Sequence, residues 1–355
     1  MDINKLLELT NEKKASDLHI TTGIPPMVRI NGDLQPLSLP SLGPEDSKEI
    51  VEQLLKKDKS IYERFLEKGE VDFSFAVPQL GRYRVNVFKQ RGTYAAALRT
   101  VGIHIPTMEA LGLPTPILKS LADNARGLIL VTGPTGSGKS TTLATMINYI
   151  NDSKKCHVLT LEDPIEYLHK HKNSIVNQRE IGIDSRSYGE ALRAALREDP
   201  DVILVGEMRD QETISTAITA AETGHLVLST LHTIGAPQTI DRIIDVFPPH
   251  QQQQIKVQLA NILKGVLSQQ LLPRYDVKGR CVALEIMINN PAITNLIREG
   301  KTHQIYSQIQ TGGLSGMVTM DSSIAKLYKE GRISLETANQ YAQIKDELKR
   351  LLERR

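Results

Sequence analysis

The chain has 355 residues, of which 40% are hydrophobic and 24% charged, so its composition is that of a globular protein. This length exceeds the ~250–300 residues at which a single core usually stops growing, and we expect two domains. The 43 lysines and arginines nearly balance the 41 aspartates and glutamates, which disfavours binding to nucleic acid by bulk charge. The two cysteines are too few for a disulfide framework or a four-thiolate zinc site, and no secretory leader or apolar run of about 18 residues is visible, so we expect a cytoplasmic protein.

Residues 1–100 have the mixed pattern of a small α/β domain. In the stretch 82–88, Tyr83, Val85 and Val87 alternate with polar residues, as in a strand with one buried face. The apolar spacing and the turn residues predict helices at 3–9 and 47–65, strands at 18–20, 27–30, 71–77 and 82–88, and a hairpin turn at Asn31-Gly32.

Residues 101–114 are rich in proline and glycine, including Gly102 and Gly112. Because both residue types interrupt helices and strands, this segment is predicted to be a linker or hinge between two domains.

From residue 115 to residue 355 the pattern is that of a second α/β domain. Short apolar strands alternate with helices, which indicates a parallel sheet covered on both faces. Past Pro248 we expect mainly helices. The expected strands are 128–131, 158–161, 202–205 and 226–229, and the expected helices are 137–150, 187–197, 213–222 and 335–352.

A phosphate-binding loop follows the first strand of this domain and opens its first helix. The sequence GPTGSGKS fits the pattern G-x-x-x-x-G-K-[ST], in which backbone N–H groups hold phosphate oxygens, the lysine bridges the β- and γ-phosphates and the hydroxyl binds Mg²⁺. ATP and Mg²⁺ are therefore the expected cofactors, with Ser140 as a metal ligand. The predicted nucleotide-binding residues here are Gly133, Pro134, Thr135, Gly136, Ser137, Gly138, Lys139, Ser140 and Thr141.

Acidic and histidine residues follow the other parallel strands. Because ligands bind at the carboxyl ends of such strands, Glu166, Glu207 and His232 are expected near the nucleotide. We assign Glu207 to the metal and its water shell, Glu166 to the attacking water and His232 to the γ-phosphate; the roles of the two glutamates can be exchanged. His225 precedes the strand that His232 follows, so it is expected in packing or a subunit contact.

Four motifs at these places resemble the Walker A, Asp-box, Walker B and His-box series of secretion and pilus ATPases. They are GPTGSGKS, TLEDPIE (160–166), DVILVGEMRD (201–210) and TGHLVLSTLHT (223–233). Within that superfamily, the resemblance to the retraction ATPases of type IV pili runs nearly from end to end and includes ASDLHI (15–20), GRYRVNVF (81–88) and DVFPPHQQQQ (245–254). The segment AITNLIRE (292–299) is similar to the AIRNLIRE typical of retraction ATPases, with Thr294 where that segment usually has arginine.

The resemblance implies a PAS-like N-terminal domain and a RecA-like ATPase domain with a helical C-terminal extension. It implies a homohexamer at the cytoplasmic face of the inner membrane, associated with that membrane only peripherally. There it would hydrolyse ATP with Mg²⁺ and act through an integral-membrane platform protein to depolymerise the pilus, as in twitching motility. It also implies that Arg84 and Arg99 reach the γ-phosphate when the domains close, with Arg82 on the same face as a third candidate.

The sequence also permits other classes of function. A RecA-like nucleic-acid motor would need clustered basic residues and aromatics to stack bases, but aromatics are 4% of the chain and tryptophan is absent. A nucleotide-gated scaffold without hydrolysis would lack a catalytic acid, whereas Glu166 and Glu207 are both present. Within the superfamily, an accessory retraction ATPase or a secretion or pilus assembly ATPase is an alternative, although assembly ATPases usually carry a tetra-cysteine site and more N-terminal domains.

Overall fold

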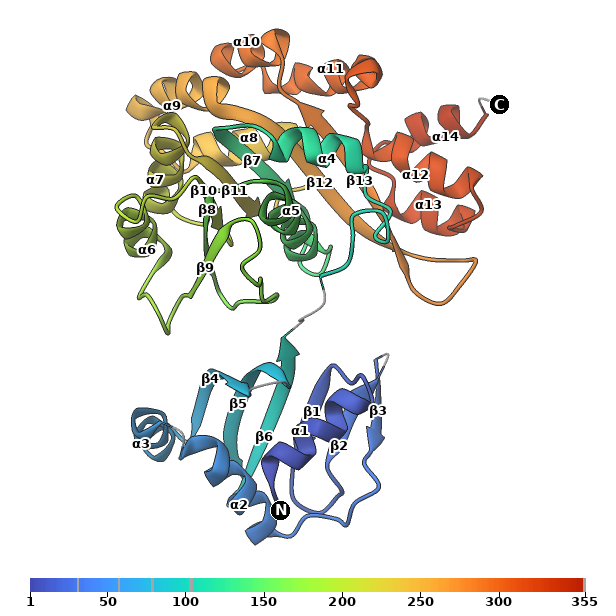
Figure 1. Ribbon diagram of the computed structural model, residues 1–355. Helices are drawn as coiled ribbons and strands as arrows, with labels where there is room; N and C mark the ends of the chain where they lie inside the picture. The colour runs from blue at the N-terminus through green and yellow to red at the C-terminus, as the bar shows by residue number, and fades with distance from the viewer. Residues whose placement is uncertain (31, 57, 78–79, 102–104, 354–355) are drawn as a thin grey trace. The chain divides into compact units, whose positions relative to one another are not determined.

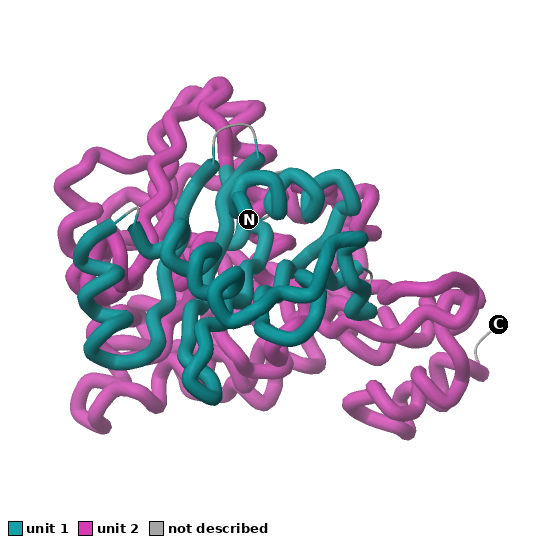
Figure 2. The backbone as a smooth tube through the Cα atoms, turned by 90° about the horizontal axis from the view of Figure 1, so that it is seen from below, with its two compact units in different colours: residues 1–104, 166–168 teal, residues 105–165, 169–355 magenta. Residues whose placement is uncertain are grey.

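The computed structural model describes residues 1–30, 32–56, 58–77, 80–101 and 105–353. The chain divides into two compact units, coloured in Figure 2: residues 1–104 with 166–168, and residues 105–165 with 169–355. The predicted linker at 101–114 spans the passage of the chain from unit 1 to unit 2. Gly102, like Asn31 of the predicted hairpin turn, lies outside the described residues, and the hinge role stays a prediction.

Unit 1 is built on a six-stranded antiparallel sheet in the order β3-β2-β1-β6-β5-β4 (Figure 1). The alternation expected in β5 is present, because Tyr83, Val85 and Val87 are buried in the core together with Phe65 and Leu98. The elements are α1 (Ile3–Glu12), β1 (Asp17–Ile20), β2 (Met27–Ile30), β3 (Asp33–Pro36), α2 (Pro44–Leu55), α3 (Lys59–Lys68), β4 (Glu70–Val77), β5 (Gly81–Gln90) and β6 (Thr93–Val101).

The prediction of one helix over 47–65 is wrong, since α2 ends at Leu55 and α3 begins at Lys59. The cause is Asp58, an N-cap in extended conformation whose carboxylate accepts a hydrogen bond from the Ser60 N–H. Strand β6 was not expected from the sequence, although it pairs with both β1 and β5.

Unit 2 has a seven-stranded sheet in the order β13-β12-β7-β11-β10-β8-β9. The strands from β12 to β9 in this order run parallel, and only β13 is antiparallel to its neighbour. The strands are β7 (Gly127–Thr132), β8 (His157–Glu162), β9 (Ile175–Glu180), β10 (Val202–Val205), β11 (Leu226–Leu231), β12 (Leu263–Pro273) and β13 (Arg280–Ile288).

Helices cover both faces of this sheet (Figure 1). In β7 successive residues enter opposite cores: Leu128 and Leu130 join one buried cluster, and Ile129 and Val131 join the other. The first face packs mainly against α6 (Tyr188–Ala195), α7 (Gln211–Glu222), α8 (Ala236–Asp245), α9 (Pro249–Ile262), α10 (Pro291–Glu299) and α11 (Ile305–Thr311), and the second against α4 (Thr115–Ala122) and α5 (Lys139–Ser153).

The expectation of a mainly helical chain past Pro248 is wrong for 263–288, where β12 and β13 form an antiparallel pair at one edge of the sheet. Strand β12 is buried along nearly its whole length, so it lacks the alternation that marks a half-exposed strand. Strand β9, next to β8 at the opposite edge, was not expected either.

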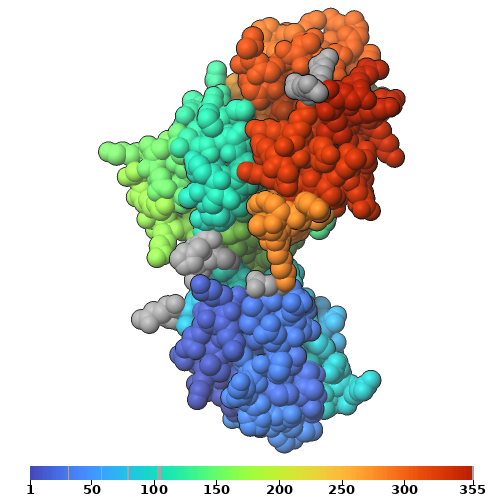
Figure 3. Space-filling view, turned by 90° about the vertical axis from the view of Figure 1, so that its right-hand side faces the viewer, coloured from blue at the N-terminus to red at the C-terminus, as the bar shows by residue number. Residues whose placement is uncertain are grey.

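The C-terminal part is helical, but the predicted helix at 335–352 is two helices. After α12 (Met320–Lys329), helix α13 spans Leu335–Tyr341 and α14 spans Lys345–Glu353. The break is held by Asp321, whose fully buried carboxylate accepts hydrogen bonds from the N–H groups of Gln343 and Ile344 at 2.8 and 2.9 Å. Figure 3 shows α12–α14 (red) on one face of unit 2, with the β12–β13 loop (orange) beside them.

Candidate active site

The loop between β7 and α5 has the backbone of a phosphate cradle. Gly133, Gly136 and Gly138 all have positive φ values, of 137°, 78° and 88°. Side-chain-bearing residues rarely adopt such angles, so the glycines allow the chain to fold back on itself before α5 begins at Lys139. The loop therefore ends at the N-terminus of α5, where free N–H groups and the helix dipole favour an anion.

Gln269 of β12 is hydrogen-bonded to this loop and to the first turn of α5. Its buried side chain donates from Nε2 to the Ser137 carbonyl oxygen at 2.6 Å and accepts from the Thr142 hydroxyl at 2.8 Å. A Cβ at Gly133 would lie 2.2 Å from the Gln269 carbonyl oxygen, and one at Gly138 would lie 2.8 Å from Gln269 Nε2. The first and last loop glycines thus serve close contact with β12 as well as the turn.

The predicted phosphate-binding side chains lie along this loop and the first turn of α5. Lys139 is buried, and its ammonium donates to the carbonyl oxygens of Gly133 and Pro134 at 2.9 and 3.0 Å. Ser140 and Thr141 are half-buried on α5, whereas Pro134, Thr135 and Gly136 are exposed. The middle of the loop is therefore exposed to solvent, and the Lys139 ammonium is buried beneath it.

The carboxyl ends of β7, β11, β10 and β8 lie in this order along one edge of the parallel sheet. The phosphate loop follows β7, His232 follows β11, Glu207 follows β10 and Glu162 ends β8. Strands β7 and β10 are separated only by β11, so they lie roughly 10 Å apart. The fold thus brings the loop, His232 and Glu207 to one edge within unit 2.

Glu207 lies between two basic side chains. Its Oε2 atom is 2.7 Å from Arg209 Nε and 3.3 Å from His232 Nε2. The backbone that carries it is held by β11, because the Ser229 and Thr230 hydroxyls donate to the carbonyl oxygens of Val205 and Gly206 at 2.7 and 2.6 Å. The carboxylate is only 15% exposed, so its position is fixed by its neighbours.

A second acid, Glu162, lies at the end of β8. Its Oε1 atom accepts hydrogen bonds from the Thr160 hydroxyl at 2.6 Å and from Gln178 Nε2 at 3.2 Å. A Cβ on Gly206 would lie 3.4 Å from Glu162 Cα and 2.8 Å from the Tyr188 hydroxyl, so β8, β10 and α6 meet closely here. Burial raises the pKa of Tyr188, and the charges of Glu207, Asp163 and Glu162 raise it further, so this phenol stays protonated beside the acids.

Other predicted residues belong to unit 1. Glu166 is exposed and lies in the 166–168 segment grouped with that unit. Arg84 and Arg99 are cross-strand partners on β5 and β6, and Arg99 Nε is 2.9 Å from Asp17 Oδ1. Arg82 lies two residues before Arg84 on β5, on the same face of the strand. Their roles at a nucleotide stay predictions.

His225 lies at the opposite end of β11 from His232. Its Nδ1 atom is 2.8 Å from the Ala220 carbonyl oxygen, and its own carbonyl oxygen accepts from the Gly127 N–H at 3.0 Å. It closes the turn between α7 and β11, which gives it a local packing role.

Sequence reasoning missed Gln269, Arg209 and Tyr188 as members of this site. Arg209 could have been predicted from the sequence, because it lies two residues after Glu207 in the motif DVILVGEMRD. Gln269 was hidden because its strand was expected to be helical. Tyr188 was hidden because only the folded chain brings α6 to the end of β10.

The fold and this edge define a P-loop nucleotide-binding protein of the α/β class. The family model for type II/IV secretion system proteins matches residues 2–353, so the chain belongs to that family. It is 50% identical over 345 residues to the type IV pilus retractation ATPase PilT of Pseudomonas aeruginosa, covering 97% of this chain and 99% of the relative. It is 41% identical over 352 residues to the type IV pilus ATPase PilU of the same organism, covering 99% and 91%. Its structure resembles the crystal structure of the pilus retraction motor PilT with bound ADP, with a TM-score of 0.92, 51% identity and 99% coverage of both chains.

These relatives confirm the expected resemblance to pilus retraction ATPases, the α/β fold class and the expectation of an ATPase. Within the part of the chain that the structure describes, no helix has both the length and the apolar character needed to cross a bilayer.

Proposed function

We propose that this chain is a motor that hydrolyses ATP to retract a type IV pilus. One observation carries the proposal: Glu207, 3.3 Å from His232, lies on the sheet edge that also carries the phosphate loop. The match to the retraction motor PilT over nearly the whole of both chains supports the direction of the work, retraction rather than assembly.

The chemistry follows from charge and position. Backbone N–H groups of 133–141 bind the phosphates, and Lys139 neutralises the β- and γ-phosphate oxygens. The donors present fit Mg²⁺, since a hydroxyl at Ser140 and a carboxylate at Glu207 are both oxygen ligands. Bound Mg²⁺ would withdraw charge from the phosphates. Glu166 would accept the proton of the attacking water, or exchange roles with Glu207, and His232 would hydrogen-bond the γ-phosphate.

The larger assembly belongs to the same proposal. Arg84 and Arg99 would complete the nucleotide site, with Arg82 as a further candidate, and the segment at 101–114 would serve as the hinge. The chain would work as a homohexamer at the cytoplasmic face of the inner membrane, pulling on an integral-membrane platform protein. An accessory retraction ATPase, or a type II secretion or pilus assembly ATPase, is the alternative.

Phosphate release by the purified protein tests the hydrolysis step. Lys139→Ala removes the charge that holds the β- and γ-phosphates, so turnover should fall at least about a hundredfold. Arg126→Ala, an exposed cation of unit 2, is the matched control and should keep normal turnover. Equal turnover of wild type and Lys139→Ala would remove this loop from the mechanism.

A further inference from the structure

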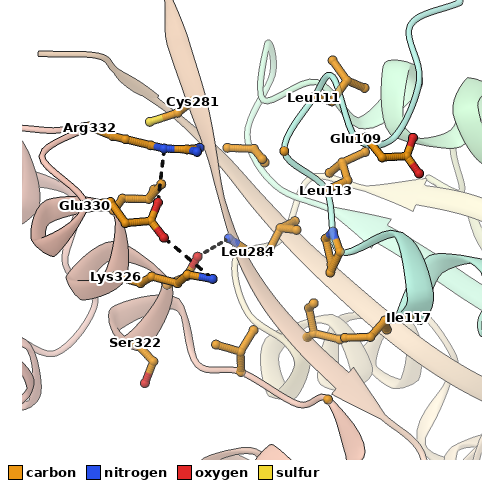
Figure 4. A pocket seen from close by; sticks show the side chains of 18 of the residues that line it. Glu109, Leu111, Leu113, Ile117, Cys281, Leu284, Ser322, Lys326, Glu330 and Arg332 are labelled. Carbon is orange, nitrogen blue, oxygen red and sulfur yellow. Dashed lines mark hydrogen bonds and ion pairs between the residues drawn. The ribbon is translucent and has the colours of Figure 1, made fainter. Parts of the chain in front are cut away.

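A cavity of about 720 Å³ lies within unit 2 and shares no residue with the phosphate loop or with the ends of β8, β10 and β11. Its walls come from the segment 109–117, from strand β13 and from the region of α12 (Figure 4). This volume is within the range of small-molecule pockets.

One part of the cavity lining is apolar. Leu284 and Ile286 of β13 and Met317 are buried residues that line it, and Leu113 and Ile117 face them from the other wall. Figure 4 shows Leu284 between the α12 side and the side that carries Leu111, Leu113 and Ile117. Binding of an apolar group here would remove its surface from water, and the free energy gained is proportional to the apolar area buried.

The two walls approach each other at separate points. A Cβ at Gly112 would lie 3.8 Å from Arg332 Nη1, and a Cβ at Gly316 would lie 2.8 Å from Ile117 Cδ1. Both glycines have positive φ values, of 71° and 82°. The segment 109–117 therefore lies against the opposite wall at two places and forms one side of the cavity.

The polar part of the lining is mainly basic. It contains four basic side chains and two acidic ones, Glu109 and Glu330. Glu330 is shared by two cations, at 3.2 Å from Arg332 and 3.9 Å from Lys326. Arg274 is paired instead with Asp276, at 2.8 Å.

Arg280 is the remaining cation of the lining. It makes no side-chain hydrogen bond or ion pair within the described ranges, and it is exposed at the start of β13. Arg280 can therefore bind the charged head of an amphipathic anion, and the apolar part of the lining can contact its body.

We propose that this cavity binds an amphipathic anion, with an apolar body along Leu284 and Ile117 and a carboxylate or phosphate head against Arg280. A charge-assisted hydrogen bond to guanidinium selects the head, and the apolar walls select the body. Because 109–117 forms one wall, the bound ligand also restrains the end of the 101–114 segment and the start of α4.

Calorimetric titration of the full chain with decanoate, decyl phosphate and decanol tests the proposal. We expect saturable binding of one anion per chain, with decanol at least about tenfold weaker because it lacks the charge. The tighter of the two anions identifies the head group. Decanol binding as tightly as both anions would overturn the proposal, and so would no saturable binding of either anion.

Two variants locate the site. Arg280→Gln should weaken binding about tenfold, whereas Arg126→Gln, at an exposed cation of unit 2 outside the lining, should leave it unchanged. Val282→Trp fills the cavity and should abolish binding. Unchanged affinity in both Arg280→Gln and Val282→Trp would contradict this location.

A second measurement does not depend on the folding of Val282→Trp. Hydrogen exchange in the wild-type chain should slow at the amides of 109–117 when decanoate is bound, and α7 should show no change. No slowing at 109–117 at saturation would contradict the proposed contact. Neither measurement uses ATP turnover, so its result is independent of the proposed motor function.

Discussion

At the scale of single residues, the site is set by side chains that fix other groups. Glu207 is oriented by Arg209 and His232, and its backbone is held by Ser229 and Thr230. The identity of the loop, Glu207 and His232 could be predicted, because each follows an apolar strand in a recognisable motif. Their supports could not, because Gln269 and Tyr188 come from elements that only the folded chain brings to this edge.

The positioning role of Gln269 gives a prediction at this scale. Gln269→Leu removes two buried hydrogen bonds and leaves the Ser137 carbonyl without its donor, so the dissociation constant for ATP should rise about tenfold or more. Gln269→Glu keeps the bond from Thr142 but loses the one to Ser137, and should have an intermediate effect. Nucleotide titration of both variants measures this, and an unchanged dissociation constant in Gln269→Leu would show that the loop holds its shape without β12.

At the scale of elements, the spacing of apolar residues predicted the central strands β7, β8, β10 and β11 of unit 2. It did not predict β9, β12 and β13 at the two sides of the sheet. Strand β10 lies where it was expected, at Val202–Val205, because short apolar runs between helices are typical of a buried parallel sheet. Strand β12 was expected to be helical because it is buried on both faces and has no alternation. The breaks near Asp58 and after Tyr341 were missed because each depends on a carboxylate that binds backbone N–H groups.

The contact between the phosphate loop and β12 can be tested with one glycine. Gly133→Ala combines a positive φ, which costs about 1–3 kcal/mol, with a Cβ 2.2 Å from a backbone oxygen, which costs about 1–3 kcal/mol more. Gly224→Ala has a similar φ of 123° and no atom within 4 Å, so it should show the first cost only. Denaturant unfolding of both variants measures the difference, and equal losses of stability would refute the close contact.

At the scale of the whole molecule, the charges of Asp321 and Glu347 in the C-terminal helices act on Glu285 of β13. Glu285 of β13 is buried and accepts a hydrogen bond from the Ala236 N–H at 2.7 Å. Burial raises its pKa above the usual 4.5, and the nearby Asp321 and Glu347 raise it further. The hydrogen bond from Ala236 lowers the pKa, but burial outweighs it, so Glu285 gives up its proton at a higher pH in the folded chain than in the unfolded chain.

This arrangement predicts how stability changes with pH. A carboxyl with a raised pKa in the folded state contributes its full stability below pH 4.5 and loses it as the pH rises through the folded value. Glu285→Gln keeps the acceptor for Ala236 and cannot ionise, so it should stabilise the chain more at pH 8 than at pH 4.5. Thermal melts of wild type and variant at both pH values test this, and a variant less stable than wild type at pH 8 would contradict it.

The central proposal for the whole molecule is that ATP hydrolysis at Glu207 powers pilus retraction. The most direct measurement is to place Glu207→Gln in the gene of the organism that carries this chain and to count surface pili and their retraction events. We predict excess pili that do not retract, because ATP still binds but hydrolysis is slow. Normal retraction would contradict the role of Glu207, and cells without pili would indicate assembly instead.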